Sequence, residues 1–597
     1  MHGPLQKCTR RGPPDRDALA VPWRGEDMRQ LKTDALVIGG GAAGTYAALC
    51  LHRQGVAPLV ISKGLVGKSG ASIFAGNLVI SGRVLGNTED NARDTAEFLI
   101  RYHNQFLIDQ EYAKRCGQWI AEAYYPELEE AGLYFRRDDA GNVVTSPGRI
   151  RSIAANVQGN SGVPFMDLRR KQLLRAGIPM LEEAVVTALL QSESGEVCGA
   201  VALDLATGEL FSVLAKAVVL ATGYADRLHW RSTGTREMSA DGLALAWRVG
   251  AQLVNLEMQW WHTNDVRFPE NWQRMQVYPN PMLGSWKSAR NVNAQGEVFF
   301  NQQEDDPLAF GPYTVQLKRL VKQVRAGKAR YDGGYFSGFD HVDPAEVEAY
   351  TTYAKLFKQL GLEVGRDLVE TAVSAHYRQG GVRVDAQSMA STVPGLYVAG
   401  GVGGHSNGLI ALVTFDGKVA ADAVARAIRE QPYASIPHSM LEKERQRVEA
   451  LMKPGGIAPA KVKKAIRALM WNYMGVEKNA AGMQRALERL EQIRTNELPA
   501  MGLPSLTRAF NHGWLDAIDA VNMVEVCALT VHSALNRKES RGPFIRTDYP
   551  EMDNENWLAQ NILVPTGRGD FRFETVPYAL PYYRPEFARR DNLAVQW

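Results

Sequence analysis

Residues 34–62 read DALVIGGGAAGTYAALCLHRQGVAPLVIS, and this stretch decides the fold. The apolar run 34–38 predicts a buried strand, residues 45–55 have the apolar spacing of a helix, and residues 57–62 predict a second strand. Between strand and helix, Gly39, Gly41 and Gly44 match the G-x-G-x-x-G pattern. The segment therefore predicts an α/β, Rossmann-type domain that binds a dinucleotide pyrophosphate at the helix N-terminus.

Two later segments complete this domain. Residues 217–223 (AVVLATG) form an apolar run that ends in Thr222-Gly223, and residues 394–404 (PGLYVAGGVGG) form another strand that enters a glycine-rich turn. An amphipathic helix is predicted over 407–428, and helix-forming residues dominate after Pro437. We expect a split nucleotide-binding domain with an inserted domain. The expected divisions are a loose N-terminal tail (1–28), the first nucleotide-binding segment (29–250), an inserted α+β capping domain (251–370), the second nucleotide-binding segment (371–432), a helical domain (433–560), and a C-terminal tail for partner docking (561–597).

Composition describes an ordinary folded protein. The chain has 597 residues, 45% hydrophobic and 22% charged, so it is long enough for several domains and too apolar for a disordered chain. Its net charge of +3 argues against a dedicated nucleic-acid or membrane-surface binder. The five cysteines contain no C-x-x-C pair, which excludes an in-chain iron–sulfur cluster of the usual spacing and predicts no metal site and no disulfide framework.

Targeting signals are weak. No stretch approaches the roughly 18 uninterrupted apolar residues of a membrane span. Residues 1–27 lack the apolar segment of a signal peptide, and none follows Arg10-Arg11, so a twin-arginine signal is disfavoured. Met28 is an alternative translation start. We expect a cytoplasmic protein in a reducing compartment, with peripheral association to a membrane complex as the alternative.

A series of motifs resembles the flavoprotein subunits of succinate dehydrogenase, fumarate reductase, L-aspartate oxidase and adenylylsulfate reductase. The motifs occur in family order over residues 34 to about 575. They are VIGGGAAG (37–44), ISK (61–63), ATGYADRLHWRSTGTREMSADGLALAWRVGA (221–251), AHYRQGGVRVD (375–385) and NRKESRGPFIRTDYPEMDNENWL (536–558).

The resemblance implies FAD, a substrate site between the capping domain and the flavin, and an electron-transfer partner such as an iron–sulfur protein. Residues 407–409 begin a helix whose amides would stabilise negative charge on the reduced flavin. The FAD contacts implied are Gly39, Gly41, Ala42, Ala43, Gly44, Ser62, Lys63, Ser69, Gly70, Ala71, Thr222, Gly223, Asp241, Gly400, Asn407, Gly408 and Leu409.

Departures from the family pattern are informative. Gly70 stands where succinate dehydrogenase and fumarate reductase carry the histidine that links FAD covalently, so we expect noncovalent FAD. The turn whose arginine clamps a substrate carboxylate aligns with Gly403-Gly404-His405, and Tyr313 lies near the position of the proton-delivering arginine. Because a buried carboxylate without a partner costs several kcal/mol, we expect a small acid other than fumarate or succinate as substrate.

Several features favour the adenylylsulfate reductase branch instead. KSGA (68–71), FDGKVA (415–420) and FRFETVPYA (571–579) resemble segments of that enzyme. Arg267 matches an arginine that faces its substrate. An enzyme acting at sulfur therefore stays as the alternative.

The candidate catalytic residues are His262, His376, Arg267, Tyr313 and His405. His262 and His376 fall in the family's two substrate-histidine motifs, where a histidine hydrogen-bonds a substrate oxygen or supplies a proton. A purely structural role is the ordinary alternative for each. Trp260 and Trp261 form either an aromatic wall or core packing. A flavoprotein that only passes electrons, without a substrate site, is the alternative of another class, and RNA binding is disfavoured by the mixed charges of residues 441–449.

Overall fold

The computed structural model describes residues 28–75, 78–79, 88–135, 137–141, 143, 152–153, 161–268, 290–301, 314–330, 333–338, 345, 358–363, 365–405, 408–567 and 569–595. Residues 1–27, the expected loose tail, lie outside this set, as do two predicted site residues, Tyr313 and Asn407.

A mixed sheet forms the nucleotide-binding domain. Its parallel region places β1 between β2 and β8, and β16 adds to β8 from far along the chain. Two antiparallel strands, β7 and β6, extend the other edge. The strands are β1 (Arg29–Ile38), β2 (Pro58–Ser62), β5 (Met180–Glu182), β6 (Ala184–Gln191), β7 (Val197–Asp204), β8 (Leu210–Leu220) and β16 (Leu396–Val398).

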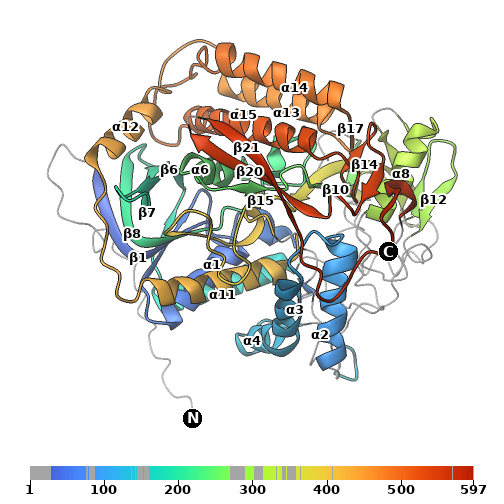
Figure 1. Cartoon of the computed structure of the whole chain (residues 1–597), viewed down its shortest axis with the longest axis horizontal. Helices are drawn as coiled ribbons and strands as arrows, with labels where there is room; N and C mark the ends of the chain where they lie inside the picture. Colours follow the sequence, from blue (N-terminus) through green and yellow to red (C-terminus); the bar gives the residue numbers. More distant parts are fainter. Residues whose placement is uncertain are drawn as a thin grey trace.

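Two helices pack together beside this sheet. α1 (Ala42–Arg53) follows the glycine turn and has ten buried residues in succession, Ala42 to Leu51. α11 (Ile410–Ala427) lies against it, although it follows β16 in the second half of the chain (Figure 1). The split Rossmann-type domain is therefore confirmed.

Further helices surround this domain. Their bounds are α2 (Thr88–Glu97), α3 (Gln110–Trp119), α4 (Tyr125–Glu130), α5 (Gly162–Ala176) and α6 (Asp241–Arg248).

The inserted capping domain has its own sheet, in the order β10-β14-β13-β11-β12. Trp261, Leu317, Leu320 and Tyr335 belong to its separate hydrophobic cluster. All of β14 pairs within this sheet. The expected domain boundary at residue 370 therefore falls inside a strand of the capping domain. The elements are β10 (Gln259–Val266), β11 (Arg290–Val292), β12 (Val298–Asn301), α8 (Thr314–Arg325), β13 (Tyr335–Gly338) and β14 (Leu368–Arg378).

Helices dominate the next region of the chain. The helices are α12 (His438–Glu449), α13 (Pro459–Tyr473), α14 (Ala480–Gln492) and α15 (His512–Asn536), and α13 and α14 lie over α15 at the top of Figure 1. By length and composition α15 alone among the described helices is apolar enough to cross a membrane. Most of its apolar window (72%) is buried inside the protein, which is typical of a core helix.

The expected C-terminal tail over 561–597 is not met in the described residues. β20 (Ala559–Gly567) pairs with β21 (Asp570–Pro577) and with β9 (Leu253–Val254), which in turn pairs with β15 (Gly381–Val382). The aromatic strip that follows lies on this chain's own α3, because both Tyr582 N and Tyr583 N donate to Gln110 Oε1, each at 3.0 Å. These hydrogen bonds, from backbone amides to the Gln110 side chain, make the aromatic strip an integral part of the fold.

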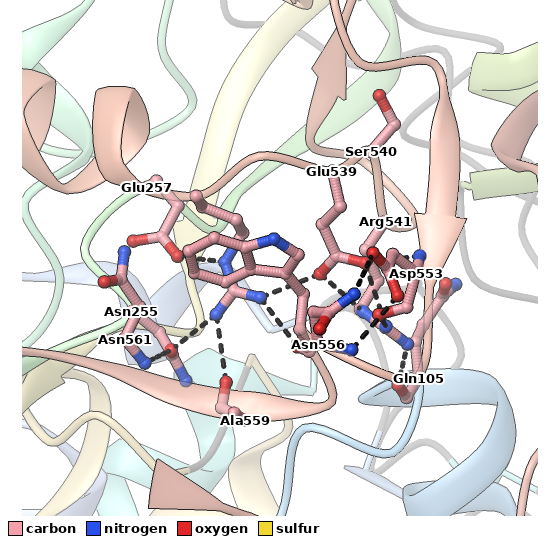
Figure 2. A network of polar contacts seen from close by, with 12 residues as sticks. Gln105, Asn255, Glu257, Glu539, Ser540, Arg541, Asp553, Asn556, Ala559 and Asn561 are labelled. Carbon is pink, nitrogen blue, oxygen red and sulfur yellow. Dashed lines mark hydrogen bonds and ion pairs between the residues drawn. The ribbon is translucent and has the colours of Figure 1, made fainter. Parts of the chain in front are cut away.

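A network of buried charges holds the segment 536–558 in place (Figure 2). Arg537 is fully buried, pairs with Glu257 and Glu539, and donates to Asn255 Oδ1 at 3.0 Å. Arg541 pairs with the other oxygen of Glu539 at 2.9 Å. The arginines of this motif therefore connect the C-terminal segment to residues 255–257, at the start of the capping domain.

Candidate active site

A long cleft opens at the carboxyl ends of β1, β2 and β8, the edge where ligands of open α/β sheets bind. The space in it that water-sized molecules can occupy is about 130 Å³. Thirteen of the expected cofactor contacts line it: Gly39, Gly41, Ala42, Ala43, Ser62, Lys63, Ser69, Gly70, Ala71, Thr222, Gly223, Asp241 and Gly400.

The glycine turn is shaped as a phosphate site requires. Gly39 has φ +124°, and a β-carbon there would lie 2.1 Å from the carbonyl oxygen of Ala221. Gly41 is the N-cap of α1 and its side is open except for Ser72 Oγ. Gly44 does not line the cleft. It packs on the carbonyl oxygen of Gly39 instead, so its role is close packing of helix and strand.

The residues present fit FAD. The N-terminus of α1 directs amides and a positive dipole end toward the cleft. Thr222 Oγ1 is buried in the cleft wall and has no hydrogen-bond partner among the described residues, so it offers a donor and acceptor to a ligand. No group of three or more His, Cys, Asp or Glu in the described ranges is arranged to hold a metal ion.

Lys63 and Asp241 border the cleft, but their charges are directed elsewhere. Lys63 Nζ binds Asp241 Oδ2 at 2.7 Å and Asp519 Oδ1, on α15, at 2.6 Å. Burial lowers the pKa of Lys63, but the two carboxylates outweigh it, so its pKa stays above the ordinary value. These ion pairs tie the cleft wall to the helical domain, and the expected contact of Lys63 and Asp241 with FAD stays a prediction.

The second glycine-rich segment lines the cleft with Ala399, Gly400 and Gly401. Gly400 lines it and donates its N–H to Asp416 Oδ2 at 3.1 Å. Leu409 is the N-cap of α11, but neither Leu409 nor Gly408 is among the lining residues. Their expected contact with the flavin stays a prediction.

His262 and His376 lie side by side on β10 and β14. Their ring centroids are 5.0 Å apart at an interplanar angle of 70°. His376 Nδ1 forms a 2.7 Å hydrogen bond with Thr233 Oγ1, which fixes its ring. Burial lowers the pKa of His376 to about 4 and, together with the nearby His376, lowers the pKa of His262 well below its ordinary value. Both rings are therefore neutral at pH 7, which suits hydrogen bonding to a substrate more than donation from an imidazolium.

Aromatic side chains connect these histidines with the cleft. The ring of Tyr377 lies 5.0 Å from that of His376, 5.4 Å from that of Trp260 and 6.0 Å from that of Tyr224. Tyr224 itself lines the cleft. Trp261 faces the other way and packs on Trp471, at 6.0 Å, so it belongs to the core.

His405 is held by an acid. Its Nε2 lies 2.9 Å from Asp416 Oδ1, and the hydroxyl of Tyr112 donates to the same oxygen at 2.5 Å. Asp416 is completely buried. The sequence prediction missed Asp416, Tyr112 and Tyr224. The signal for Tyr224 was its place after Thr222-Gly223, where the family carries a second glycine.

Arg267 is not brought together with the histidine pair. It follows β10 and forms an ion pair with Glu370, which Arg330 also approaches at 3.5 Å. Five residues of extended strand separate it from His262, a span of roughly 16 Å. Its expected place against a substrate is therefore not supported by its contacts.

Comparison with known proteins agrees with this architecture. Residues 34–412 match the family described as FAD binding domain, and residues 463–590 match the family described as fumarate reductase flavoprotein C-term. A fumarate reductase (CoM/CoB) subunit of Methanothermobacter marburgensis is 27% identical over 87% of this chain and 95% of its own length.

Solved structures have the same fold. Sdh1 of Mycobacterium smegmatis superimposes with a TM-score of 0.80 at 25% identity, covering 93% of this chain and 96% of that one. Adenylylsulfate reductase of Archaeoglobus fulgidus superimposes with a TM-score of 0.76 at 20% identity, covering 94% and 99%.

Proposed function

This chain belongs to the FAD-dependent oxidoreductases of the succinate dehydrogenase and fumarate reductase flavoprotein family, and we propose that it acts on a small acid other than fumarate or succinate. We further propose that it exchanges the electrons with a partner redox protein. The observation that carries the proposal is the turn Gly403-Gly404-His405, which aligns with the family's carboxylate-clamping arginine.

The shape of this turn disfavours an arginine. A β-carbon on Gly404 would lie 2.3 Å from Val254 Cγ1 and 2.9 Å from the backbone nitrogen of Gly381, so a longer side chain would displace the strand pair β9–β15. The next residue, His405, binds the buried carboxylate of Asp416. A bidentate arginine–carboxylate pair is among the strongest polar contacts in a desolvated site. Its loss removes the main reason for a four-carbon dicarboxylate to bind.

Two described arginines, Arg378 and Arg267, form contacts other than the clamp. Arg378 follows His376 by two residues, but it donates to Thr530 Oγ1 on α15 at 2.8 Å. Arg267 is neutralised by Glu370. The second expected departure, at Tyr313, lies outside the described residues.

Bound FAD would supply the two-electron chemistry, and this chain's residues would hold the substrate against it. The neutral rings of His262 and His376 would hydrogen-bond a substrate oxygen, with Thr233 fixing the orientation of His376. Trp260, Tyr377 and Tyr224 would contact an apolar or planar portion of the substrate and keep water away. These contacts favour a larger, less charged acid.

A redox partner is inferred from the relatives and from the cysteines. The methanogen relative is by its name one subunit of a fumarate reductase. The four described cysteines, Cys50, Cys116, Cys198 and Cys527, are single buried thiols. We therefore infer that electrons leave or reach the flavin through a second protein, with an iron–sulfur protein as the first candidate.

The adenylylsulfate alternative is not favoured. Its best sequence marker, Arg267, is engaged with Glu370, and the likeness to the solved adenylylsulfate reductase shows only the fold. Adenylylsulfate is therefore included as one of the substrates in the test.

An anaerobic screen tests the proposal. The reduced holoenzyme is mixed separately with fumarate, adenylylsulfate and a set of enoyl-type acids, and flavin reoxidation is followed by absorbance. We expect an enoyl-type acid to react fastest and fumarate to react negligibly. Reoxidation by fumarate at a typical turnover, on the order of 10 per second, would contradict the proposal. Fast reoxidation by adenylylsulfate that Arg267→Ala abolishes would replace it by the alternative.

A further inference from the structure

A second cavity lies in the capping domain, apart from the flavin cleft. Its volume is about 520 Å³, within the range of small-molecule sites. It lies between α8, the turn of the β11–β12 hairpin and the C-terminal residues Leu593 and Val595. Four cationic side chains line it, with one acidic residue: Lys318, Arg319, Lys322, Lys328 and Glu297.

Lys318 is the buried member of this group. Its side chain is 5% exposed, and its Nζ donates to the carbonyl oxygen of Val595 at 3.1 Å. Burial lowers the pKa of Lys318 to about 7; Asp591 opposes this shift and Lys322 adds to it. A lysine held in this way has no carboxylate bonded to its amine among the described residues, and an anion that entered the cavity would favour its charged form.

The other charges leave the cavity wall with an excess of positive charge. Lys328 is neutralised by Glu297, at 2.7 Å. Arg319 is already engaged, since it donates to the carbonyl oxygen of Phe299 at 3.4 Å and its guanidinium lies 6.0 Å from the Phe300 ring centroid. Lys322 is exposed at the rim, and no described residue forms an ion pair with it. The described lining residues therefore carry four cationic groups against one carboxylate.

We propose that this cavity binds a small organic anion with at least two negative charges, on phosphate, sulfate or carboxylate groups. Lys318 and Lys322 would hold the charged groups, and Phe299, Val315 and Leu593 would contact the organic portion. The two lysines lie one turn apart on the same helix, so a single ligand can reach both of them.

The cavity is also connected to the candidate substrate site. Gln316, two residues before Lys318 on α8, accepts a 2.5 Å hydrogen bond from Thr263, the neighbour of His262 on β10. Leu317 and Leu320 of the same helix pack in one cluster with Trp261. A ligand that moved α8 would therefore act on the strand that carries His262.

Titration calorimetry on the FAD-saturated holoenzyme tests the site, because bound FAD keeps the probe out of the glycine turn. The probes are sulfate and pyrophosphate at constant ionic strength, with chloride as the control salt. Sulfate does not change its protonation near pH 7. The heat of sulfate binding is therefore measured at pH 7 in two buffers of different ionisation enthalpy, and the difference reports protons taken up by the protein. We expect saturable binding with net uptake of protons, because burial lowers the pKa of Lys318 to about 7 and a bound anion favours its charged form.

Three variants sharpen the result. Lys318→Met should weaken sulfate binding by about tenfold or more and abolish the proton uptake. Lys322→Glu, at an exposed position, should also weaken it by about tenfold without risk to folding. Lys171→Met, an exposed lysine on α5, should change neither quantity.

The proposal would be overturned if sulfate gave no saturable heat beyond that of chloride. It would also be overturned if Lys318→Met and Lys322→Glu both bound sulfate with the wild-type affinity. Binding that emerged only after removal of Gln596 and Trp597 would also overturn it, because the site would then serve a segment of this chain. The flavin-reoxidation screen reads a different site, so either proposal can fail alone.

Discussion

The imidazole rings of His262 and His376 form an edge-to-face pair across the β10–β14 ladder, with centroids 5.0 Å apart. The capping sheet thus places two neutral hydrogen-bonding rings together, next to the aromatic side chains that lead to the flavin cleft. This pair is the basis of the first two predictions.

Replacement of either histidine by asparagine should lower kcat/KM by about 10²–10⁴-fold while FAD content stays unchanged. The amide keeps a polar group of smaller size but cannot reproduce the ring's position against a substrate oxygen. Turnover is measured with the acid that reoxidises the wild-type flavin fastest. His52→Asn, on the exposed side of α1, is the matched control and should keep full activity. Full activity in His376→Asn as well would assign the pair a structural role.

The pH dependence of stability should carry the signature of His376. Its pKa of about 4 lies below the ordinary value of about 6.5. The unfolded chain therefore binds more protons in this window, so the stability from this group is fully present above pH 6.5 and is lost as pH falls through 4. We expect wild type to lose about 1–3 kcal/mol more than His376→Asn between pH 7 and pH 4, measured by urea unfolding. Parallel pH profiles would contradict the prediction.

FAD should be bound without a covalent link. Gly70 lines the cleft at the position of the family's linking histidine and has no side chain to form the bond. Acid precipitation should release all flavin absorbance into the supernatant. Flavin fluorescence that stayed with the denatured polypeptide on a gel would show the prediction to be wrong.

The buried network around Arg537 should be far more important for stability than exposed ion pairs. Arg537→Met leaves Glu257 and Glu539 buried without their shared partner, so we expect a loss of about 3–5 kcal/mol in the free energy of unfolding. Arg494→Met breaks an exposed pair with Glu491 and should cost less than about 0.5 kcal/mol. Urea unfolding followed by circular dichroism compares the two, and equal losses would remove the distinction.

Local patterns predicted the fold well. The glycine spacing of residues 39–44 and the flanking strands depend on neighbours in sequence, so the Rossmann-type domain was within reach, and the family resemblance implied the other cleft residues. The helix α15 falls inside the expected helical domain (433–560), although it is buried on most sides and lacks the amphipathic spacing of a surface helix.

Long-range partners were beyond the sequence. Nothing local to Lys63 reveals that its charge meets Asp519, and nothing in residues 578–583 indicates that Gln110 fixes them. The same holds for His405, whose hydrogen bond to Asp416 depends on how the turn meets α11. Such contacts arise only when the sheet brings distant segments together.

The Lys63–Asp519 ion pair has a consequence for biosynthesis. Its two residues are 456 positions apart in the sequence. Asp519 is therefore synthesised roughly half a minute to a minute and a half after Lys63. Over that time Lys63 has at most one of its two carboxylate partners, Asp241, and the cleft wall lacks β16, which joins β8 only late. Nascent chains that end before α15 should therefore capture flavin poorly and depend on chaperones, whereas the finished chain closes the cleft wall at once.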